Sequence, residues 1–373
     1  MTALDRTPLV DLVTDDAGLQ SLAPEWDRLL ADAEHPTVFL TSAWIGAWRS
    51  TLGRHHRLLI ATARHPATGT LLGVAPFAVE ERRLGPAAAP TLVLAGSGPA
   101  APDHLDLIVR HGHPHVAPAL WAAVAAVCTW DLIDLDGLRA ESHLGRLLAR
   151  RRSDRPARVT RTPCPVLPLP ATWDEYEASL GKNLRQNLRR YRRKLEREVG
   201  PVVERLVLDP AEAVAVVGLL AGFHQDVRTS RGDRGSFADP RMVSFHREVA
   251  LRFLEAGRLR LHLLEVAGRP AAAISCVRHG DVVSFYTTGY DQGLAAYGPG
   301  REVMAAAIRS AIAEGAAAFD FLRGDEAYKR SWGAVDAFDE RIRMPAGARG
   351  RVLSQAAAAV RPLRAGMRRL RGR

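Results

Sequence analysis

Six titratable side chains lie within ten positions of one another, just after a short apolar run in the last third of the chain. They are Asp320, Arg323, Asp325, Glu326, Tyr328 and Lys329. Transfer of a group to an amine needs a base for the ammonium proton and an acid for the leaving group. Asp325 and Glu326 are the candidate bases. The alternative is structural, with the charged groups paired to one another and the aromatic ones, including Trp332, packed in a helix.

A glycine turn precedes this cluster. Gly298-Pro299-Gly300 stands between a strand-like run, 282–290, and a helix expected over 301–314. Backbone N–H groups at a helix N-terminus suit a phosphate or diphosphate. The turn alone is also typical of a helix that begins with proline in its first turn. The alternation along 282–290 indicates a half-buried strand.

The stretch 180–198 predicts a strongly basic helix with one apolar stripe. The stripe consists of Leu180, Leu184, Leu188, Tyr191 and Leu195. Among its cations, Lys182, Arg185 and Arg189 are candidates for contacts with a phosphorylated substrate or a nucleic acid. A solvated helix face is the alternative, and the few aromatic residues give little support for base stacking.

The order of the expected elements divides the 373 residues into two halves. Each half has helices, then a meander of strands, then a further helix, and a proline-rich stretch, 155–170, predicts an extended crossing between them. We therefore expect an α/β protein, in the broad sense that includes α+β folds, with mixed sheets. Its expected parts are domains 1–165 and 166–345 and an Arg-rich tail, 346–373.

The net charge of +10 comes mostly from this tail, which has eight arginines and no acid. A basic amphipathic tail suits an anionic membrane surface, with disorder as the alternative. No apolar run is long enough to span a membrane, and the first residues lack the pattern of a signal peptide, so a cytoplasmic location is expected. The scattered Cys128, Cys164 and Cys276 are expected to be small buried hydrophobic residues. No metal site is expected, and the alternating histidines of 111–115 indicate a solvated loop.

Together these motifs resemble the acyl-CoA-binding core of GNAT-type N-acyltransferases, in the branch described as BioF2-like or CelD-like acetyltransferases. The resemblance covers about 173–333 and rests on Tyr290-Asp291, Tyr297-Gly298-Pro299-Gly300, Phe319 to Asp325, Tyr328-Lys329 and Trp332-Gly333. In place of the Arg or Gln that opens the usual GNAT phosphate motif, this chain has Ala295.

The resemblance implies two tandem GNAT-like lobes, the first degenerate, each with a central sheet flanked by helices. It implies an acetyl-CoA or other acyl-CoA donor, no metal, and direct attack by an amine of a small molecule or peptide. The strand 282–290 is expected to splay from its neighbour and bind the pantetheine arm, while the glycine turn binds the diphosphate. The cofactor-binding residues so implied are Tyr286, Thr287, Thr288, Gly289, Tyr297, Gly298, Gly300 and Arg301.

The resemblance also assigns roles around the acceptor. Tyr328 is implied as the acid, and His224, before the glycine-rich loop 228–236, as a base or acceptor-binding residue. A histidine favoured by the helix dipole is the alternative for His224. Lys182, Arg185 and Arg189 of the basic helix are not the only substrate-binding candidates. The others are Asp320, Arg323, Lys329 and Trp332.

The basic helix and the ending Tyr328 to Gly333 also resemble Fem-type peptidoglycan aminoacyltransferases, which take an amino acid from aminoacyl-tRNA. This second resemblance leaves two other donors open, an aminoacyl-tRNA or an acyl group on a carrier protein. A third alternative is a non-catalytic protein that binds nucleic acid or a membrane through the basic helix and tail.

Overall fold

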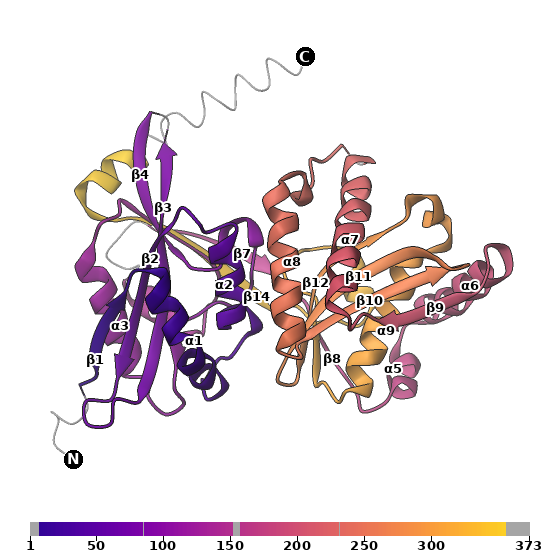
Figure 1. The fold of residues 1–373 in the computed structure, drawn as a ribbon, viewed down its shortest axis with the longest axis horizontal. Helices are drawn as coiled ribbons and strands as arrows, with labels where there is room; N and C mark the ends of the chain where they lie inside the picture. The colour runs from indigo at the N-terminus through magenta and orange to yellow at the C-terminus, as the bar shows by residue number, and fades with distance from the viewer. Residues whose placement is uncertain (1–6, 85, 152–156, 231, 356–373) are drawn as a thin grey trace. The chain divides into compact units, whose positions relative to one another are not determined.

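The computed structural model describes residues 7–84, 86–151, 157–230 and 232–355. Its internal contacts divide the chain into two units. The first takes its described residues from Met1–Ile45, Gly53–Arg161 and Asp339–Arg373, and the second from Gly46–Leu52 and Thr162–Phe338. Each unit has a mixed sheet flanked by helices (Figure 1), which confirms the expected fold class.

The first sheet has the strand order β1-β2-β3-β4-β6-β14-β7, with β5 paired to β3. Among the strand pairs with a described register, β4 and β6 are parallel and the others are antiparallel. Strands β2 and β3 form an antiparallel hairpin. The strands are β1 (Leu9–Val13), β2 (Arg57–Arg64), β3 (Leu71–Leu84), β4 (Ala87–Leu94), β5 (Ile108–Val109), β6 (Leu132–Arg139), β7 (Arg158–Pro163) and β14 (Phe338–Pro345).

Helices α1 and α3 pack on strands β1 to β3 of this sheet. Helix α1 turns one apolar stripe to the core, and its buried residues are Leu19, Leu22, Trp26, Leu29 and Leu30. The helices in this half of the chain are α1 (Asp16–Ala31), α2 (Ser42–Ser50), α3 (Val116–Val127) and α4 (His143–Arg151).

The second sheet has the order β8-β13-β12-β11-β10-β9. Strands β9 to β12 form an antiparallel meander, and β12 pairs in parallel with β13. The parallel pair requires a crossover, which helix α9 makes. The strands are β8 (Val166–Pro168), β9 (Val202–Leu206), β10 (Leu259–Val266), β11 (Arg269–His279), β12 (Val282–Tyr290) and β13 (Ala318–Asp320). The helices are α5 (Trp173–Ser179), α6 (Lys182–Glu198), α7 (Pro210–Ser230), α8 (Pro240–Glu255), α9 (Pro299–Ala313) and α10 (Ala327–Ser331).

Two neighbouring residues of β12 show which helix covers which face of this sheet. A Cβ added at Gly289 would lie 2.8 Å from the backbone of α7 at Leu220 and His224, so α7 packs directly on that face. Successive residues of a strand point to opposite faces. The ring of Tyr290 lies against Gly300 of α9 on the other face. The sheet is therefore sandwiched between α7 and α9.

The last strand is a difference from the sequence expectation, which placed 338–345 with the second domain. In the structure β14 pairs with β6 of the first sheet. The reason is an alternation of apolar and basic residues: Ile342 and Met344 are buried, while Arg341 and Arg343 pair with Asp134. The proline-rich stretch is also more regular than expected, because it contains β7 and β8.

Three further features concern the remaining expectations. Cys164 and Cys276 are buried as expected, but Cys128 is exposed, and the expectation for that residue is wrong. No helix in the described part of the chain is both long and apolar enough to cross a membrane. Most of the Arg-rich tail lies outside the described residues; within them, Arg349 pairs with Asp131 at 2.6 Å.

Candidate active site

Strand β12 loses its neighbour on one side partway along its length. It pairs with β13 only over Val282 to Ser284, whereas its pairing with β11 continues to Tyr290. The register with β11 shifts at Tyr286, which is the extra residue of a β-bulge. The second half of β12 therefore has backbone groups on one edge that no strand of the described chain pairs with. Such an edge is able to bind an extended ligand by main-chain hydrogen bonds.

Helix α9 begins just beyond this edge. Gly298, its N-cap, has a φ of 66°, a left-handed conformation that glycine adopts without strain, and Pro299 fills the first helical position. A Cβ at Gly300 would lie 2.9 Å from the Tyr290 ring, so a side chain there would displace that ring. The amides of the first turn and the helix dipole make this end a site for an anion.

Cations of α6 and α9 gather around the glycine turn. The guanidinium carbons of Arg190 and Arg301 lie 5.0 and 5.1 Å from the centre of the Tyr191 ring, and the ammonium of Lys194 lies 4.7 Å from that of Tyr297. Hydrogen bonds from Arg190 and then Arg301 lower the pKa of the Tyr191 hydroxyl. Neither arginine forms an ion pair with a carboxylate of the described residues. Both positive charges are therefore available to a bound anion.

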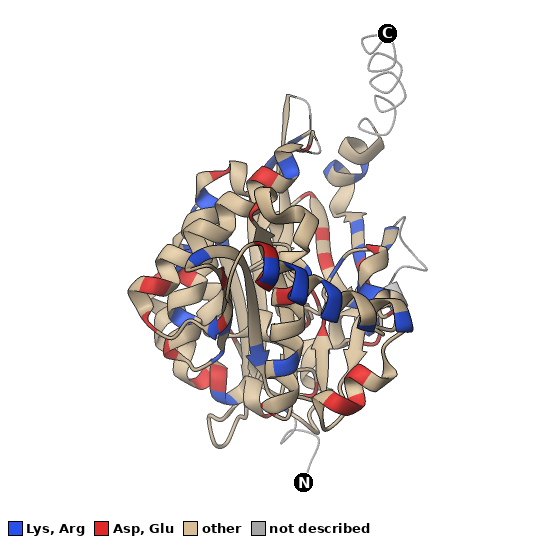
Figure 2. Cartoon of the chain, turned by 90° about the vertical axis from the view of Figure 1, so that its right-hand side faces the viewer, with Lys and Arg blue, Asp and Glu red and all other residues tan. Residues whose placement is uncertain are grey.

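Sequence reasoning missed Arg190, Tyr191 and Lys194 as site residues and chose another face of α6. Lys182, Arg185 and Arg189 instead line a groove with Asp174, Glu177 and Ala178 of α5. Arg189 pairs with Glu177 at 2.9 Å, and Arg185 donates to the carbonyl of Ala178. In Figure 2 the helix with closely spaced blue bands is α6, which has cations on more than one face. Tyr191 belongs to the expected apolar stripe. In the structure its ring contacts the guanidinium groups of Arg190 and Arg301 instead of the core.

The loop after β13 is held together by two of the predicted substrate-binding residues. Lys329 is 2% exposed, and its ammonium donates to the carbonyls of Leu322 and Arg323 at 3.1 and 2.7 Å. Asp320 is also buried and accepts from the Leu322 N–H at 2.8 Å. Trp332 is a core residue, with its carbonyl bonded to the Tyr176 hydroxyl. These three contacts position the loop, and Arg323 stands half-buried within it.

The candidate bases and acid lie on and before the short helix α10. Asp325 pairs with Arg330 at 2.6 Å, and Glu326 pairs with Lys329 at 3.1 Å. Burial, and then the charge of Glu326, raises the pKa of the Tyr328 hydroxyl, although 42% of the residue is exposed. A hydroxyl with a raised pKa keeps its proton at neutral pH, as a general acid must.

Aromatic contacts connect Tyr328 to the unpaired edge of β12. Its ring centre lies 6.4 Å from that of Phe321, which in turn lies 6.1 Å from that of Phe285. Phe285 is the first residue of β12 beyond the pairing with β13. Tyr328 thus lies near the point where the two strands part.

His224 belongs to an aromatic cluster on the opposite, α7 face of the sheet. Its ring is 5.2 Å from that of Phe237, and Phe237 is 4.6 Å from His246, whose ring stacks on Tyr286 at 5.0 Å. Burial lowers the pKa of His224 to about 4 and that of His246 to about 3, so both imidazoles are neutral at physiological pH. The Nδ1 atom of His224 is buried and has no hydrogen-bond partner among the described residues.

The other predicted cofactor residues are divided between backbone and packing roles. Thr287 and Thr288 lie on the part of β12 with the unpaired edge, and the Thr288 hydroxyl donates to the Ala273 carbonyl at 2.9 Å. Gly289 faces α7, which packs against it. The remaining predicted cofactor residues lie at the bulge or at the start of α9. They are Tyr286, Tyr297, Gly298, Gly300 and Arg301.

Comparisons with known proteins agree with this architecture. Residues 182–330 match the family model described as an acetyltransferase (GNAT) domain. No curated protein matches the chain. The fold is that of tandem GNAT-like proteins. The structure of FemX superposes with a TM-score of 0.60 at 11% identity, covering 85% of this chain and 95% of that one.

Two other solved structures share the fold over most of their length. L-PGS from Bacillus licheniformis has a TM-score of 0.52 at 11% identity and covers 90% of this chain and 96% of its own. A conserved protein of unknown function from Bacteroides thetaiotaomicron has a TM-score of 0.53 at 13% identity, with coverages of 91% and 100%. At these identities the likeness concerns the fold alone.

Proposed function

We propose that the protein is an N-acyltransferase that moves an acyl group from an acyl-CoA, with acetyl as the simplest case, to an amine. The observation that carries this proposal is the adjacency of an unpaired strand edge and a cationic helix start. The edge of β12 beyond Ser284 leads to the N-terminus of α9, where Arg190, Lys194 and Arg301 gather. An acyl-CoA has the same order of chemical groups, an amide-containing arm followed by a diphosphate.

In this proposal the chain supplies orientation and hydrogen bonds. The amides of the α9 first turn, with Arg190 and Arg301, bind the diphosphate, and the edge of β12 from Phe285 to Tyr290, along which β13 no longer pairs, binds the arm. The thioester then lies near the bulge at Tyr286, where backbone N–H groups are able to stabilise its oxygen as the amine attacks.

Two proton transfers complete the proposed reaction. The attacking amine loses a proton, for which Asp325, Glu326 and His224 are the candidates. The thiolate of CoA leaves and takes a proton from the Tyr328 hydroxyl, whose raised pKa favours the protonated form before transfer. The products are an amide and free CoA. The acceptor is an amine of a small molecule or a peptide.

Titration of the full-length protein with acetyl-CoA and with CoA, followed by calorimetry, tests the proposal. We expect saturable binding with one site per chain, and loss of that binding in Gly300→Val, because the valine would fill the first turn of α9 and displace Tyr290. Circular dichroism establishes that the variant is folded. Absence of binding to wild type at millimolar ligand would overturn the acyl-CoA proposal.

A second candidate donor is an aminoacyl-tRNA, with an acyl carrier protein as a third. The supporting observations are the FemX-like fold and the separate basic groove formed by Lys182, Arg185 and Arg189 with α5. This donor predicts salt-sensitive retention of tRNA that Arg185→Gln weakens and Arg301→Gln spares. Retention that is equal in wild type and Arg185→Gln would remove the groove as its binding site.

A further inference from the structure

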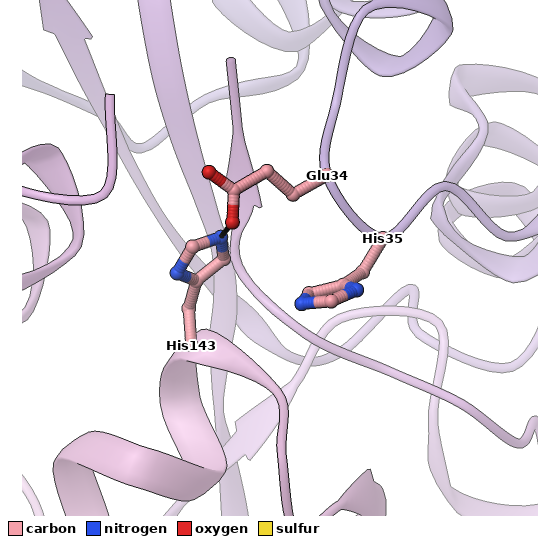
Figure 3. A group of neighbouring side chains, drawn as sticks. All are labelled: Glu34, His35 and His143. Atoms are coloured by element: carbon pink, nitrogen blue, oxygen red, sulfur yellow. Dashed lines mark ion pairs between the residues drawn. The ribbon is translucent and has the colours of Figure 1, made fainter. Parts of the chain in front are cut away.

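Three side chains that are distant in the sequence converge in the first unit. Glu34 and His35 are neighbours on the loop after α1, and His143 is the first residue of α4. Figure 3 shows Glu34 and the two imidazole rings turned toward one another. One ligand atom from each residue lies within 4.8 Å of those of the other two. None of them belongs to the acyltransfer site described above.

Two imidazole nitrogens in this group lack a hydrogen bond. The Nε2 atoms of His143 and His35 are both buried and have no hydrogen-bond partner among the described residues. His143 itself is 4% exposed. A buried polar atom without a hydrogen bond costs about 1–3 kcal/mol. Glu34 lies 3.3 Å from the His143 Nε2 without making that hydrogen bond, so a ligand shared by these atoms would remove the cost.

The spacing of two donors already fits a metal ion. The Nε2 of His143 lies 3.3 Å from a carboxylate oxygen of Glu34. Two ligands of a tetrahedral zinc ion, each about 2.0–2.1 Å from the metal, are about 3.3–3.4 Å apart. The rings of His35 and His143 are tilted at 53°, with centroids 5.4 Å apart, and the ligand atom of His35 lies within 4.8 Å of the other two.

One short segment anchors both sides of the cluster. Asp106 accepts from the backbone N–H groups of His143 and Leu144, both at 2.8 Å, and so holds the first turn of α4. Three residues later, the Val109 carbonyl accepts from the N–H of Glu34 at 3.2 Å. The ligand-bearing loop and helix are thus fixed to the same piece of chain, and such support is what a preorganised site requires.

We propose that Glu34, His35 and His143 bind one zinc-class divalent cation, with a water molecule in the fourth position. Two imidazoles and one carboxylate suit Zn²⁺ and neighbouring transition metals better than Mg²⁺ or Ca²⁺, which prefer oxygen ligands alone. The ion would join the loop after α1 to the start of α4 and stabilise the first unit. The site is independent of the acyl donor.

The test is metal binding by the chelator-treated full-length protein. Zn²⁺ is titrated against a chromophoric competitor, and Co²⁺ is added as a spectroscopic probe of coordination. We expect one equivalent of Zn²⁺ per chain, the visible absorption of four-coordinate Co²⁺, and a rise in the thermal midpoint with Zn²⁺. Glu34→Gln and His143→Gln should each weaken binding by more than the roughly 10–100-fold that loss of an outer-shell partner costs.

Controls separate this site from adventitious binding by histidines. The double variant His113→Gln, His115→Gln removes another pair of nearby rings in the same unit, with centroids 5.7 Å apart, and should keep full affinity. Because Gln at the buried position 143 threatens the fold of α4, His35→Gln serves as a second variant. Lack of zinc binding by wild type, or equal affinity in wild type, Glu34→Gln and His35→Gln, would overturn the proposal.

Discussion

The guanidinium of Arg301, in the first turn of α9, lies over the ring of Tyr191 on α6, 5.1 Å from the ring centre. Arg190 lies over the same ring, at 5.0 Å. The Tyr191 ring thus contacts two positive charges without neutralising either. In the proposed function, both charges are available to a diphosphate bound at the start of α9.

The first prediction concerns these two arginines. Arg301→Gln should weaken acetyl-CoA binding by about tenfold, because loss of one charge-assisted contact costs about 1.4 kcal/mol. Calorimetry at two salt concentrations measures this change and should show a smaller salt dependence in the variant. Arg189→Gln is the matched control, since it removes the same charge from the face of α6 that contacts Glu177. Equal losses in the two variants would mean that only the overall positive charge of the protein matters.

The second prediction concerns Tyr328. Tyr328→Phe should lower turnover by about 10²–10⁴-fold, the usual contribution of a general acid, and leave the Kd for acetyl-CoA unchanged. The release of free CoA thiol in the presence of an amine measures turnover. Tyr176→Phe is the comparison, because that buried hydroxyl bonds to the Trp332 carbonyl and should cost about 1 kcal/mol of stability without a loss of this kind. Wild-type turnover in Tyr328→Phe would exclude the tyrosine as the acid.

The third prediction separates packing from ligand binding at Gly289. Gly289→Ala should lower the free energy of unfolding by about 1–3 kcal/mol, because its Cβ would lie 2.8 Å from the backbone of α7. Gly222→Ala, on α7 itself, has open space around its Cβ and should raise stability by up to about 1 kcal/mol. Urea unfolding of both variants provides the measurement. A stable Gly289→Ala with weakened donor binding would instead support the role expected from the sequence.

The fourth prediction is a pH dependence of stability from Glu302. This carboxyl in the first turn of α9 is 5% exposed, and burial raises its pKa from 4.5 to about 7. Between these values the unfolded chain has lost the proton and the folded protein keeps it. The stability from this group is therefore complete below pH 4.5 and is lost as the pH rises through 7.

Glu302→Gln isolates this contribution. Relative to wild type, the variant should gain about 1–3 kcal/mol of unfolding free energy between pH 5 and pH 8. Denaturant titrations at several pH values measure the difference. Arg192, whose nearest guanidinium nitrogen is 3.9 Å from the Glu302 carboxylate, is the charged group that would reduce the effect. A difference between the two proteins that stays constant with pH would show that Glu302 ionises normally.

Much of the fold follows from local sequence patterns. These patterns were sufficient to predict an element where a few adjacent residues decide where it begins and which side is buried. The stripe of Leu19 to Leu30 and the glycine turn before α9 are examples, since the spacing of apolar residues and a left-handed glycine are properties of a few adjacent positions. Strand β14 was missed as part of the first sheet because its partner, β6, lies about two hundred residues earlier, and only pairing shows where it belongs.

The site was harder to predict for the same reason. The choice of Lys182, Arg185 and Arg189 on α6 depended on charge alone, and charge does not say which face of a helix meets α9. The buried Leu188 and Leu195 fix that face. A helical projection from them places Arg190 far from the buried side, so only the tertiary contacts of Arg190 and Arg301 with Tyr191 show this arrangement. Lys329 and Asp320 looked like substrate ligands because the sequence does not show that the carbonyls and N–H groups of their own loop surround them.

The most direct test of the central claim is amide hydrogen exchange of the full-length protein with and without saturating acetyl-CoA. We predict slower exchange at two places together, the half of β12 from Phe285 to Tyr290 and the first turn of α9, with little change along the α5–α6 groove. Slower exchange confined to that groove, or none in β12 and α9 under conditions where calorimetry shows saturation, would contradict it.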